Sequence, residues 1–528
     1  MASKDAKVTT QQVIDTYIRL GRNISATSRE LGIERHAVRY HLRKNPTSEY
    51  DKPSVGGKVK GTATRKIKKA GVRRYIVSSV QNNTEVPPKL LDNIKALAEH
   101  YGAEILLATY TYNKNAYGPM SVKWHTEDHA EELWYDASVL PYIVDERVEL
   151  APGLIWYGEA NISPTAVSPL RQLKKFGGQN SGLFPHAKQA MSTVPTPKLV
   201  ATKEIYTTGT LTKMNYIQKF AGFRAEFDHV YGGLIVEVDE DGTWFVRQLN
   251  ADKSWRIQDF DVIAADGEVT TGNPIEGICW GDIHEYQLEL IIKNACWGEG
   301  GILDVLRPKY QFFHDLLDFR SRNHHDEFNF HRRFALWVNG GESVARELSN
   351  AAEFLRFSTR PWCQSVVVNS NHDRALTKWL QKAKHREDPV NAEIFLELEL
   401  GVVKAITKSE PFHVLQEALA KYDAPAEAKF LWQDESFMVK GIECGMHGDE
   451  GNNGTKATPE GMDQLGVKVN MGDKHSPALI GGVMCVGVTG ALDQGYNTGP
   501  SSWARAHGLI YPNGKRTLFF MRDTRWRV

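Results

Sequence analysis

The chain has 528 residues, which exceeds the usual size of a single hydrophobic core, so two or three domains are expected. Hydrophobic residues make up 41% of the sequence and charged residues 24%, and no apolar stretch approaches the roughly 20 residues that a membrane-spanning helix requires. The five cysteines are scattered and never spaced as Cys-x-x-Cys, which argues against a disulfide framework and a structural zinc site. The first residues lack the apolar core of a secretory signal, so a cytoplasmic protein without membrane contact is expected.

The formal net charge of zero hides an asymmetry along the chain. Residues 1–75 contain 18 lysines and arginines but 6 aspartates and glutamates, a formal charge of +12, so the remainder carries −12. Residues 51–74, rich in Gly, Ser, Thr and Lys, are predicted to form a flexible basic linker. A basic head joined to an acidic body is suited to recruiting a polyanion such as DNA to a separate, metal-dependent site. The alternative is a basic tail that is simply solvated.

The segment 9–44 has the apolar spacing of three short helices, with a tight turn at Gly32 before the last one. This pattern predicts a helix-turn-helix domain within residues 1–50. Its expected core consists of Ala26, Leu31, Ile33, Val38 and Leu42. The exposed face of the last helix carries the candidate DNA contacts, which are Arg35, His36, Arg39 and Arg43. The stretch resembles bacterial and phage helix-turn-helix domains, although the same pattern also serves as a packing or dimerisation module.

The next region, residues 75–270, has the pattern of a mixed α/β domain. Apolar runs at 75–80 and 105–110 flank a helix that begins at Pro87-Pro88, which predicts a β-α-β unit. Further on, Asp241-Gly242 lies between two apolar runs and predicts a hairpin. The region contains no catalytic motif, and no role is assigned to it.

Short apolar runs in the C-terminal region, residues 271–528, each end in Asp, Asn or His. Loops that follow parallel strands meet at one edge of a sheet, so these polar side chains are expected to gather there. In chain order the clusters are Gly281-Asp282-Ile283-His284, His314-Asp315-Leu316-Leu317-Asp318, Asn369-Ser370-Asn371-His372-Asp373, Gly445-Met446-His447-Gly448-Asp449 and Gly472-Asp473-Lys474-His475. A single pair is a weak signal, whereas five clusters in this order are a strong one.

The clusters supply the ligands of a dinuclear metal centre. Two divalent ions about 3.5–4 Å apart need imidazoles and hard oxygen ligands, with open positions for water and phosphate. Asp282 and His284 are expected to bind the first ion, and Asp315 is expected to bridge the two. The remaining ligands are Asn371, His447 and His475. His372 is the candidate general acid for the leaving oxygen, and Asp373 is expected to orient its ring.

This series resembles the motifs of the calcineurin-like metallophosphoesterase superfamily, which run D-x-H, G-D-x-x-D, G-N-H-D/E, H and G-H-x-H. The resemblance implies a two-layered β-sandwich flanked by helices at residues 271–528, within a multidomain chain of the α/β (α+β) class. It also implies two divalent metal ions, with manganese expected and iron or zinc as alternatives. Carried over by motif, the ligands of the first metal are Asp282, His284, Asp315 and His475, and those of the second are Asp315, Asn371 and His447, with His372 catalytic.

Three positions depart from the family pattern. His314 stands before the bridging Asp where the family has Gly, and Ser370 replaces Gly before Asn371. The third departure matters more, because Asp473 occupies the place of the first His of G-H-x-H, a ligand of the second metal. A carboxylate ligates manganese well, so Asp473 is favoured as that ligand. Asp449, in His-Gly-Asp, is the competing candidate.

Two further features have no assigned role. His324 and His325 follow the bridging carboxylate and belong either to a phosphate pocket or to a solvated helix face. The segment 496–503, with His507, resembles the C-terminal part of phage-encoded members of the superfamily. The residue types of this segment do not assign it a role in metal binding or catalysis.

The basic head and the metal clusters together predict a metal-dependent DNA nuclease, a phosphodiesterase to which the head delivers DNA. Helix-turn-helix, basic linker and phosphoesterase in one chain resemble phage-encoded nucleases that degrade host DNA, which implies action in the host cytoplasm. DNA is the expected partner, and a homo-oligomer is compatible with the sequence. One alternative is a phosphomonoesterase acting on nucleotides or phosphoproteins. The other, prompted by the Asp473 departure, is a non-catalytic DNA-binding regulator.

Overall fold

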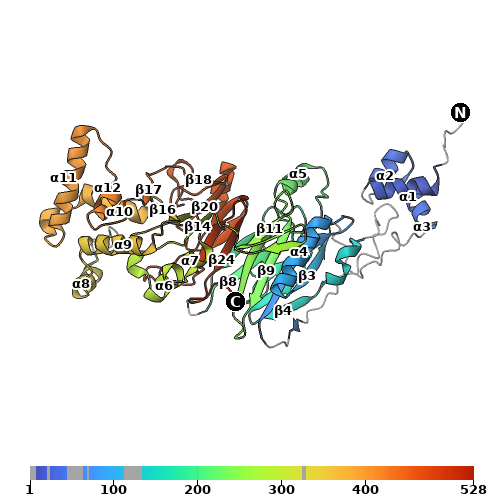
Figure 1. The fold of residues 1–528 in the computed structure, drawn as a ribbon, viewed down its shortest axis with the longest axis horizontal. Helices are drawn as coiled ribbons and strands as arrows, with labels where there is room; N and C mark the ends of the chain where they lie inside the picture. The colour runs from blue at the N-terminus through green and yellow to red at the C-terminus, as the bar shows by residue number, and fades with distance from the viewer. Residues whose placement is uncertain are drawn as a thin grey trace.

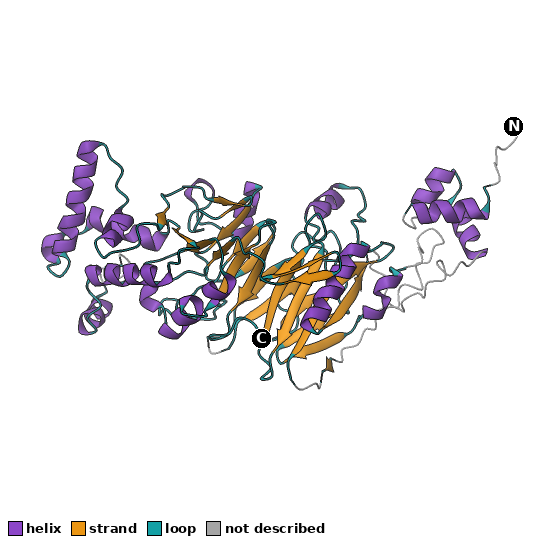
Figure 2. Cartoon of the chain, in the orientation of Figure 1, coloured by secondary structure: helices purple, strands orange, loops and turns teal. Residues whose placement is uncertain are grey.

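The structure, a computed structural model, describes residues 8–20, 24–44, 64–67, 71–111, 134–198, 200–323 and 329–528. Within these ranges the chain is mixed α/β, with helices gathered mainly at one end and sheets through the middle (Figure 1, Figure 2). His324 and His325, the candidates for a phosphate pocket, lie outside the described residues. Among the described helices, none combines the length and the apolar character needed to cross a bilayer.

Three short helices form an N-terminal unit with a hydrophobic cluster of its own. They are α1 (Thr10–Arg19), α2 (Ile24–Leu31) and α3 (Arg35–Lys44). Thr9 begins α1 with a capping box, because its hydroxyl accepts the main-chain N–H of Gln12 and the Gln12 side chain accepts that of Thr9. The cluster consists of Val13, Ile14, Tyr17, Val38 and Leu42, with Leu31 and Ile33 partly buried beside it. Val38 and Leu42 therefore lie in the core as predicted, and Ala26 is half-buried.

A four-stranded sheet begins the middle region. Its order is β10 (Trp244–Asn250), β9 (Gly232–Val238), β2 (Arg73–Gln81) and β3 (Ala103–Tyr110). The parallel strands β2 and β3 are joined by α4 (Pro88–Tyr101), which confirms the predicted β-α-β unit. Asp241-Gly242 turns between β9 and β10, which pair antiparallel as predicted. One face of the sheet packs on α4 and on a three-stranded sheet made of β11 (Ile257–Asp259), β12 (Val262–Ala265) and β13 (Glu268–Thr270).

A six-stranded sheet carries the first three predicted clusters. Its order is β17 (Lys429–Phe430), β16 (Gln364–Val367), β15 (Tyr310–Phe313), β14 (Gly277–Cys279), β23 (Ala506–Ile510) and β24 (Arg516–Phe520). Strands β14 to β17 are parallel, so their carboxyl ends share one edge. The helices that pack on this sheet are α6 (Leu290–Trp297), α7 (Ile302–Leu306), α9 (Val344–Ser358), α10 (Asn371–Lys382), α11 (Ala392–Lys408) and α12 (Val414–Ala420).

An eleven-stranded sheet combines strands from the predicted middle domain with strands from the predicted C-terminal domain. Its order is β1 (Arg65–Lys66), β4 (Arg147–Ala151), β5 (Leu154–Tyr157), β6 (Ser181–Phe184), β8 (Lys203–Thr207), β7 (Met191–Val194), β21 (Ala478–Ile480), β22 (Val483–Cys485), β20 (Lys468–Met471), β19 (Ile442–Glu443) and β18 (Met438–Val439). Three helices stand apart from the packing described so far: α5 (Phe220–Phe227), α8 (Phe330–Val338) and α13 (Pro459–Met462).

The shared sheet differs from the predicted organisation in two ways. The boundary placed between residues 270 and 271 is crossed where β7 pairs antiparallel with β21. The predicted linker 51–74 also ends in ordered strands, because β1 pairs with β4 and β2 begins at Arg73. Strand pairing uses main-chain N–H and C=O groups that every residue carries, so a pattern of residue types does not report it.

One continuous core lies between the eleven-stranded sheet and the two other large sheets. Phe312 and Val366 of the six-stranded sheet belong to the same buried cluster as Met484 of the eleven-stranded sheet. Val236 of the four-stranded sheet belongs to this cluster too. The four-stranded and six-stranded sheets adjoin at β10 and β24, whose side chains and main chains exchange hydrogen bonds. The middle and C-terminal regions therefore bury their apolar faces together.

Residues 271–528 produced alone are expected to lose cooperative folding, because β21 is deprived of its partner β7 and the shared core is opened to water. Near-ultraviolet circular dichroism and a thermal melt would measure this. The chain lacking residues 1–44 is the control and should keep a cooperative transition, since α1 to α3 have their own cluster. A native-like melt of the 271–528 fragment would contradict the expectation.

Candidate metal centre

The predicted ligands come from loops at the ends of strands in two different sheets. Asp282 and His284 follow β14, Asp315 follows β15, and Asn371 begins α10 after β16. From the eleven-stranded sheet, His447 follows β19, and Asp473 and His475 follow β20. The structure therefore brings all seven predicted ligands to one place, although they span almost 200 positions of the sequence, from Asp282 to His475.

The first group consists of four buried side chains. The possible ligand atoms of Asp282, His284, Asp315 and His475 all lie within 4.8 Å of one another. The Nε2 atoms of His284 and His475 are 3.0 Å apart. His284 Nε2 also lies 3.6 Å from Asp315 Oδ2, and His475 Nε2 lies 3.1 Å from Asp282 Oδ2. Imidazole nitrogens and carboxylate oxygens in this arrangement could hold a divalent cation.

The second group converges on Nε2 of His447. This atom lies 3.0 Å from Asn371 Oδ1 and 3.3 Å from Asp315 Oδ1. It is also 3.8 Å from Asp473 Oδ1. Asp315 thus turns one carboxylate oxygen, Oδ2, toward the first group and the other, Oδ1, toward the second. A carboxylate placed in this way is suited to bridge two cations.

The buried carboxylates of the centre lack hydrogen-bond donors of normal geometry. Among the described residues, neither carboxylate oxygen of Asp282 accepts such a bond, and neither does Asp315 Oδ1. Transfer of an ionised carboxylate into a protein interior is unfavourable unless the charge is paired or coordinates a metal. The donor set and the unpartnered oxygens therefore fit a metal ion.

Charges within the centre reinforce one another. Burial opposes ionisation of Asp315, but the imidazoles of His447 and His372 hold its pKa well below its usual range. Burial also disfavours a charged His447, yet the Asp315 carboxylate raises the pKa of that imidazole to about 10. The carboxylates therefore create a strongly negative pocket that draws positive charge to the position between the two groups.

The position of Asp473 distinguishes it from Asp449, the competing candidate. Asp473 directs Oδ1 toward His447, while its other oxygen pairs with Lys474. Asp449 is instead occupied by an ion pair with Arg374. The geometry therefore favours Asp473 as the additional ligand.

The partners of His372 differ from those predicted. Its Nδ1 lies 3.0 Å from the main-chain oxygen of Asp318 and 3.7 Å from the Oδ1 atom of the same residue. Asp373 does not orient this ring, because its carboxylate accepts the main-chain N–H of Leu317 at 2.9 Å and the hydroxyl of Ser370 at 2.8 Å. Burial raises the pKa of Asp373 to about 6. Asp373 thus fastens the start of α10 to the loop after β15.

Asp318 is the main site residue to which the sequence assigned no role. Its Oδ1 atom lies 3.5 Å from Nδ1 of His284, on the side of the ring away from the first group, as well as near His372. A carboxylate behind a metal-binding imidazole fixes the orientation of the ring. The Asp-x-x-Asp spacing of Asp315 and Asp318 is the sequence feature that could have indicated this role. His314 is a second residue of the centre to which the sequence assigned no role. With Asp282 and His447 it forms a group of side chains that could hold a metal ion.

Four of the ligand residues have left-handed backbone conformations. The φ angles are 45° for His284, 47° for Asp315, 63° for Asp473 and 54° for His475. Such conformations cost about 1–3 kcal/mol each for a non-glycine residue and persist only where the surroundings impose them. Here hydrogen bonds between the loops impose them, for example from the main-chain N–H of His284 to the oxygen of Asp315 at 2.8 Å.

Glycine permits the two sheets to approach at the centre. A Cβ atom on Gly472 would collide with Oδ1 of Asp282 and lie 3.1 Å from the side chain of His314. Only glycine therefore allows the loop after β20 to lie against the loops after β14 and β15.

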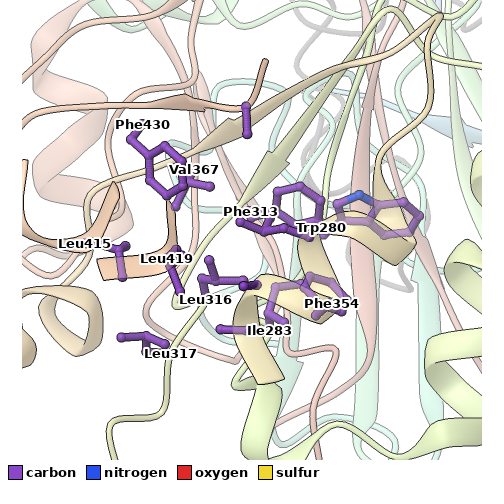
Figure 3. Close-up of a cluster of buried hydrophobic side chains, with 14 of the residues drawn as sticks. Trp280, Ile283, Phe313, Leu316, Leu317, Phe354, Val367, Leu415, Leu419 and Phe430 are labelled. Carbon is purple, nitrogen blue, oxygen red and sulfur yellow. The ribbon is translucent and has the colours of Figure 1, made fainter. Parts of the chain in front are cut away.

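Apolar neighbours anchor these loops on the helical side. Trp280 and Ile283 flank Asp282, and Leu316 and Leu317 follow Asp315; all four are fully buried. Figure 3 shows them among other side chains of the core beneath the helices, including Phe313. The predicted ligands are therefore carried on loops whose neighbouring apolar residues are packed in the core, which limits their movement.

The candidate DNA contacts lie on α3 of the N-terminal unit. Arg35 and His36 are exposed at the start of that helix. Arg39 and Arg43 are on the same helix, but their side chains lie outside those that the structure describes. None of these four residues is among the groups that could hold a metal ion in the described part of the chain.

The chain is similar to a known phage protein. Protein A1 of Escherichia phage T5 is 37% identical to this chain over 487 residues, which covers 90% of this chain and 86% of the phage protein. The phage source of this relative supports the prediction of a phage-encoded protein. No protein-family model matches the chain. No solved structure matches it either.

Addition of Mn²⁺ is expected to raise the Tm of the protein, because a ligand at about 100 times its Kd adds about 2.7 kcal/mol, or about 5 °C, to the stability of a domain of this size. Asp282→Asn should abolish most of this rise and leave the metal-free Tm equal or higher, since it removes a buried carboxylate whose oxygens accept no hydrogen bond of normal geometry. Asp449→Asn is the matched control and should keep the rise, because Asp449 pairs with Arg374 instead. Equal rises in both variants, measured by scanning calorimetry, would refute the assignment.

Proposed function

We propose that this chain, which belongs to the family of Protein A1 of Escherichia phage T5, is a metal-dependent DNA nuclease. The observation that carries the proposal is the position of Asp315, whose two oxygens face two separate groups of buried ligands. That arrangement suits hydrolysis of a phosphate ester better than binding of one structural ion, because a structural site has no need of a shared carboxylate.

The first metal would be held by Asp282, His284, Asp315 and His475, and the second by Asp315, Asn371, His447 and Asp473. A mixed set of imidazoles, carboxylates and an amide oxygen is compatible with manganese, which we favour over iron or zinc. When bound, such ions supply an activated water and neutralise the charge of the phosphate. The two packed sheets whose loops carry these residues support the proposed resemblance to calcineurin-like metallophosphoesterases.

The chain's own proton donor would be His372. The Asp318 carbonyl engages Nδ1 of the ring, which leaves Nε2 to face the leaving oxygen of the ester. The His372 ring also packs edge to face on that of His284, with 4.8 Å between centroids, so it lies beside the first group. Transfer of a proton from Nε2 to the departing oxygen would complete cleavage of the phosphodiester.

DNA is the proposed substrate because of the N-terminal unit. The first residues of α3, including Arg35 and His36, are exposed where a recognition helix makes its contacts. The acidic remainder of the chain, at −12, repels a polyanion, so the basic head would supply the attraction. The intact set of buried ligands favours this function over a non-catalytic regulator.

His372→Ala is expected to reduce cleavage of DNA by about 10²-fold or more, because a general acid contributes roughly 10²–10⁴-fold to a rate. Binding of DNA should not change, since the ring lies at the centre and not on α3. Manganese-loaded protein would be assayed on circular and linear DNA, with His100→Ala at the exposed end of α4 as the control. Intact DNA together with rapid hydrolysis of small phosphomonoesters would favour the phosphomonoesterase alternative.

Deletion of residues 1–63 is expected to weaken DNA binding and to reduce the slope of log K against log salt by about 1 for each phosphate contact that is lost. Cleavage of a short oligonucleotide at saturating concentration should persist, because the metal centre is built from residues 282–475. Fluorescence anisotropy at several salt concentrations measures the slope. Unchanged affinity and slope would show that the head does not recruit DNA.

A further inference from the structure

An aromatic series leads outward from the metal centre. The ring of Trp503 meets the ring of His475 edge to face, with 4.1 Å between centroids and 82° between planes. The ring of Tyr496 lies 5.7 Å from that of Trp503, at 68°. Both aromatic residues belong to the segment 496–503, which supplies no ligand to either group.

Solvent exposure increases along this series. His475 is buried, Trp503 is half-buried, and Tyr496 is 47% exposed. A single exposed aromatic residue needs no explanation, but this one continues a packed series that begins at a metal ligand. Burial and the carboxylates of Asp318 and Asp315 raise the pKa of Tyr496, which places its phenol in the field of the centre.

Hydrogen bonds from the middle region hold the segment in place. The Thr202 hydroxyl donates to the main-chain oxygen of Trp503 at 2.8 Å. Ser501 and Thr196 exchange main-chain hydrogen bonds of 3.0 and 2.8 Å. The segment 196–202 lies between β7 and β8, so the shared sheet positions the aromatic series beside the centre. Residues 75–270, to which the sequence assigned no role, thereby contribute to the site.

Tyr496 itself is oriented by local contacts. Its hydroxyl donates to Oε1 of the buried Gln494 at 2.9 Å. The main-chain N–H of Gln494 donates to Asn497 at 3.1 Å, and the Asn497 amide donates to the oxygen of Leu492 at 2.9 Å. With its hydroxyl engaged in this way, the residue presents a ring rather than a reactive group.

We propose that Tyr496, supported by Trp503, is a stacking site for an unpaired nucleobase of the nucleic acid strand whose phosphate lies at the centre. This inference rests on the proposed nuclease function and names its substrate class. Aromatic rings stack on any base, and such contacts give binding without sequence preference. Within a duplex the bases stack on one another, so the site selects single-stranded or frayed DNA.

The test compares two single-stranded 20-mers as substrates of the full-length, manganese-loaded protein. One is oligothymidine, and the other has the same backbone with abasic tetrahydrofuran residues throughout. The wild-type protein is expected to cleave oligothymidine about 10-fold faster, which lies within the range that base–aromatic stacking provides. Tyr496→Ala should lower that rate to the abasic rate and leave the abasic rate within about twofold, while Tyr496→Phe retains the preference.

The controls separate this inference from the function on which it depends. Phe227→Ala removes another exposed aromatic ring, on α5, and should change neither rate. Equal wild-type rates on the two strands, or an undiminished preference in Tyr496→Ala, would overturn the stacking site while leaving the nuclease function intact. Parallel loss of both rates in Tyr496→Ala would show that the residue supports the centre rather than the base. Cleavage of neither strand by wild-type protein that cleaves circular or linear DNA would overturn the stacking site alone, whereas failure on all of these substrates would overturn the nuclease function and the stacking site with it.

Discussion

The buried carboxylate of Asp315 is the constraint on which the site depends. An ionised group at this depth is stable only if positive charge surrounds it, and imidazoles approach it from both groups. To bring them there, strands from two sheets must end at the same place, four ligand residues must adopt left-handed conformations, and Gly472 must lack a side chain. Packing of the intervening apolar residues in the core holds that arrangement.

Asp318 connects a candidate metal ligand, His284, to the candidate acid, His372. Asp318 lies behind the ring of His284 and also contacts His372, so one residue orients a ligand and a proton donor together. Asp373 stabilises this unit indirectly, because it ties the start of α10 to the loop that carries Asp315. A disturbance of either carboxylate would therefore shift the candidate ligands and the ring of His372 together.

The eleven-stranded sheet gives the middle region a place in the function. Because β7 pairs with β21, the connection between β7 and β8 reaches the segment 496–503 and holds its aromatic residues beside His475. The centre and the aromatic residues that we propose to contact the substrate thus lie on one side of the predicted domain boundary, and the connection that holds the aromatic residues in place lies on the other. The arrangement explains how a region without a candidate ligand of its own contributes to the candidate metal centre.

The sequence by itself determined the local elements and the polar residues that gather at the candidate metal centre. The β-α-β unit, the hairpin at Asp241-Gly242 and the clusters after β14, β15 and β16 follow from residue patterns between chain neighbours. Only the tertiary structure decided that Asp473 rather than Asp449 lies beside His447, that His372 contacts Asp318, and that one sheet joins both regions. The physical reason is that side-chain direction at a strained loop and pairing of distant strands depend on contacts far apart in sequence, which no local pattern encodes.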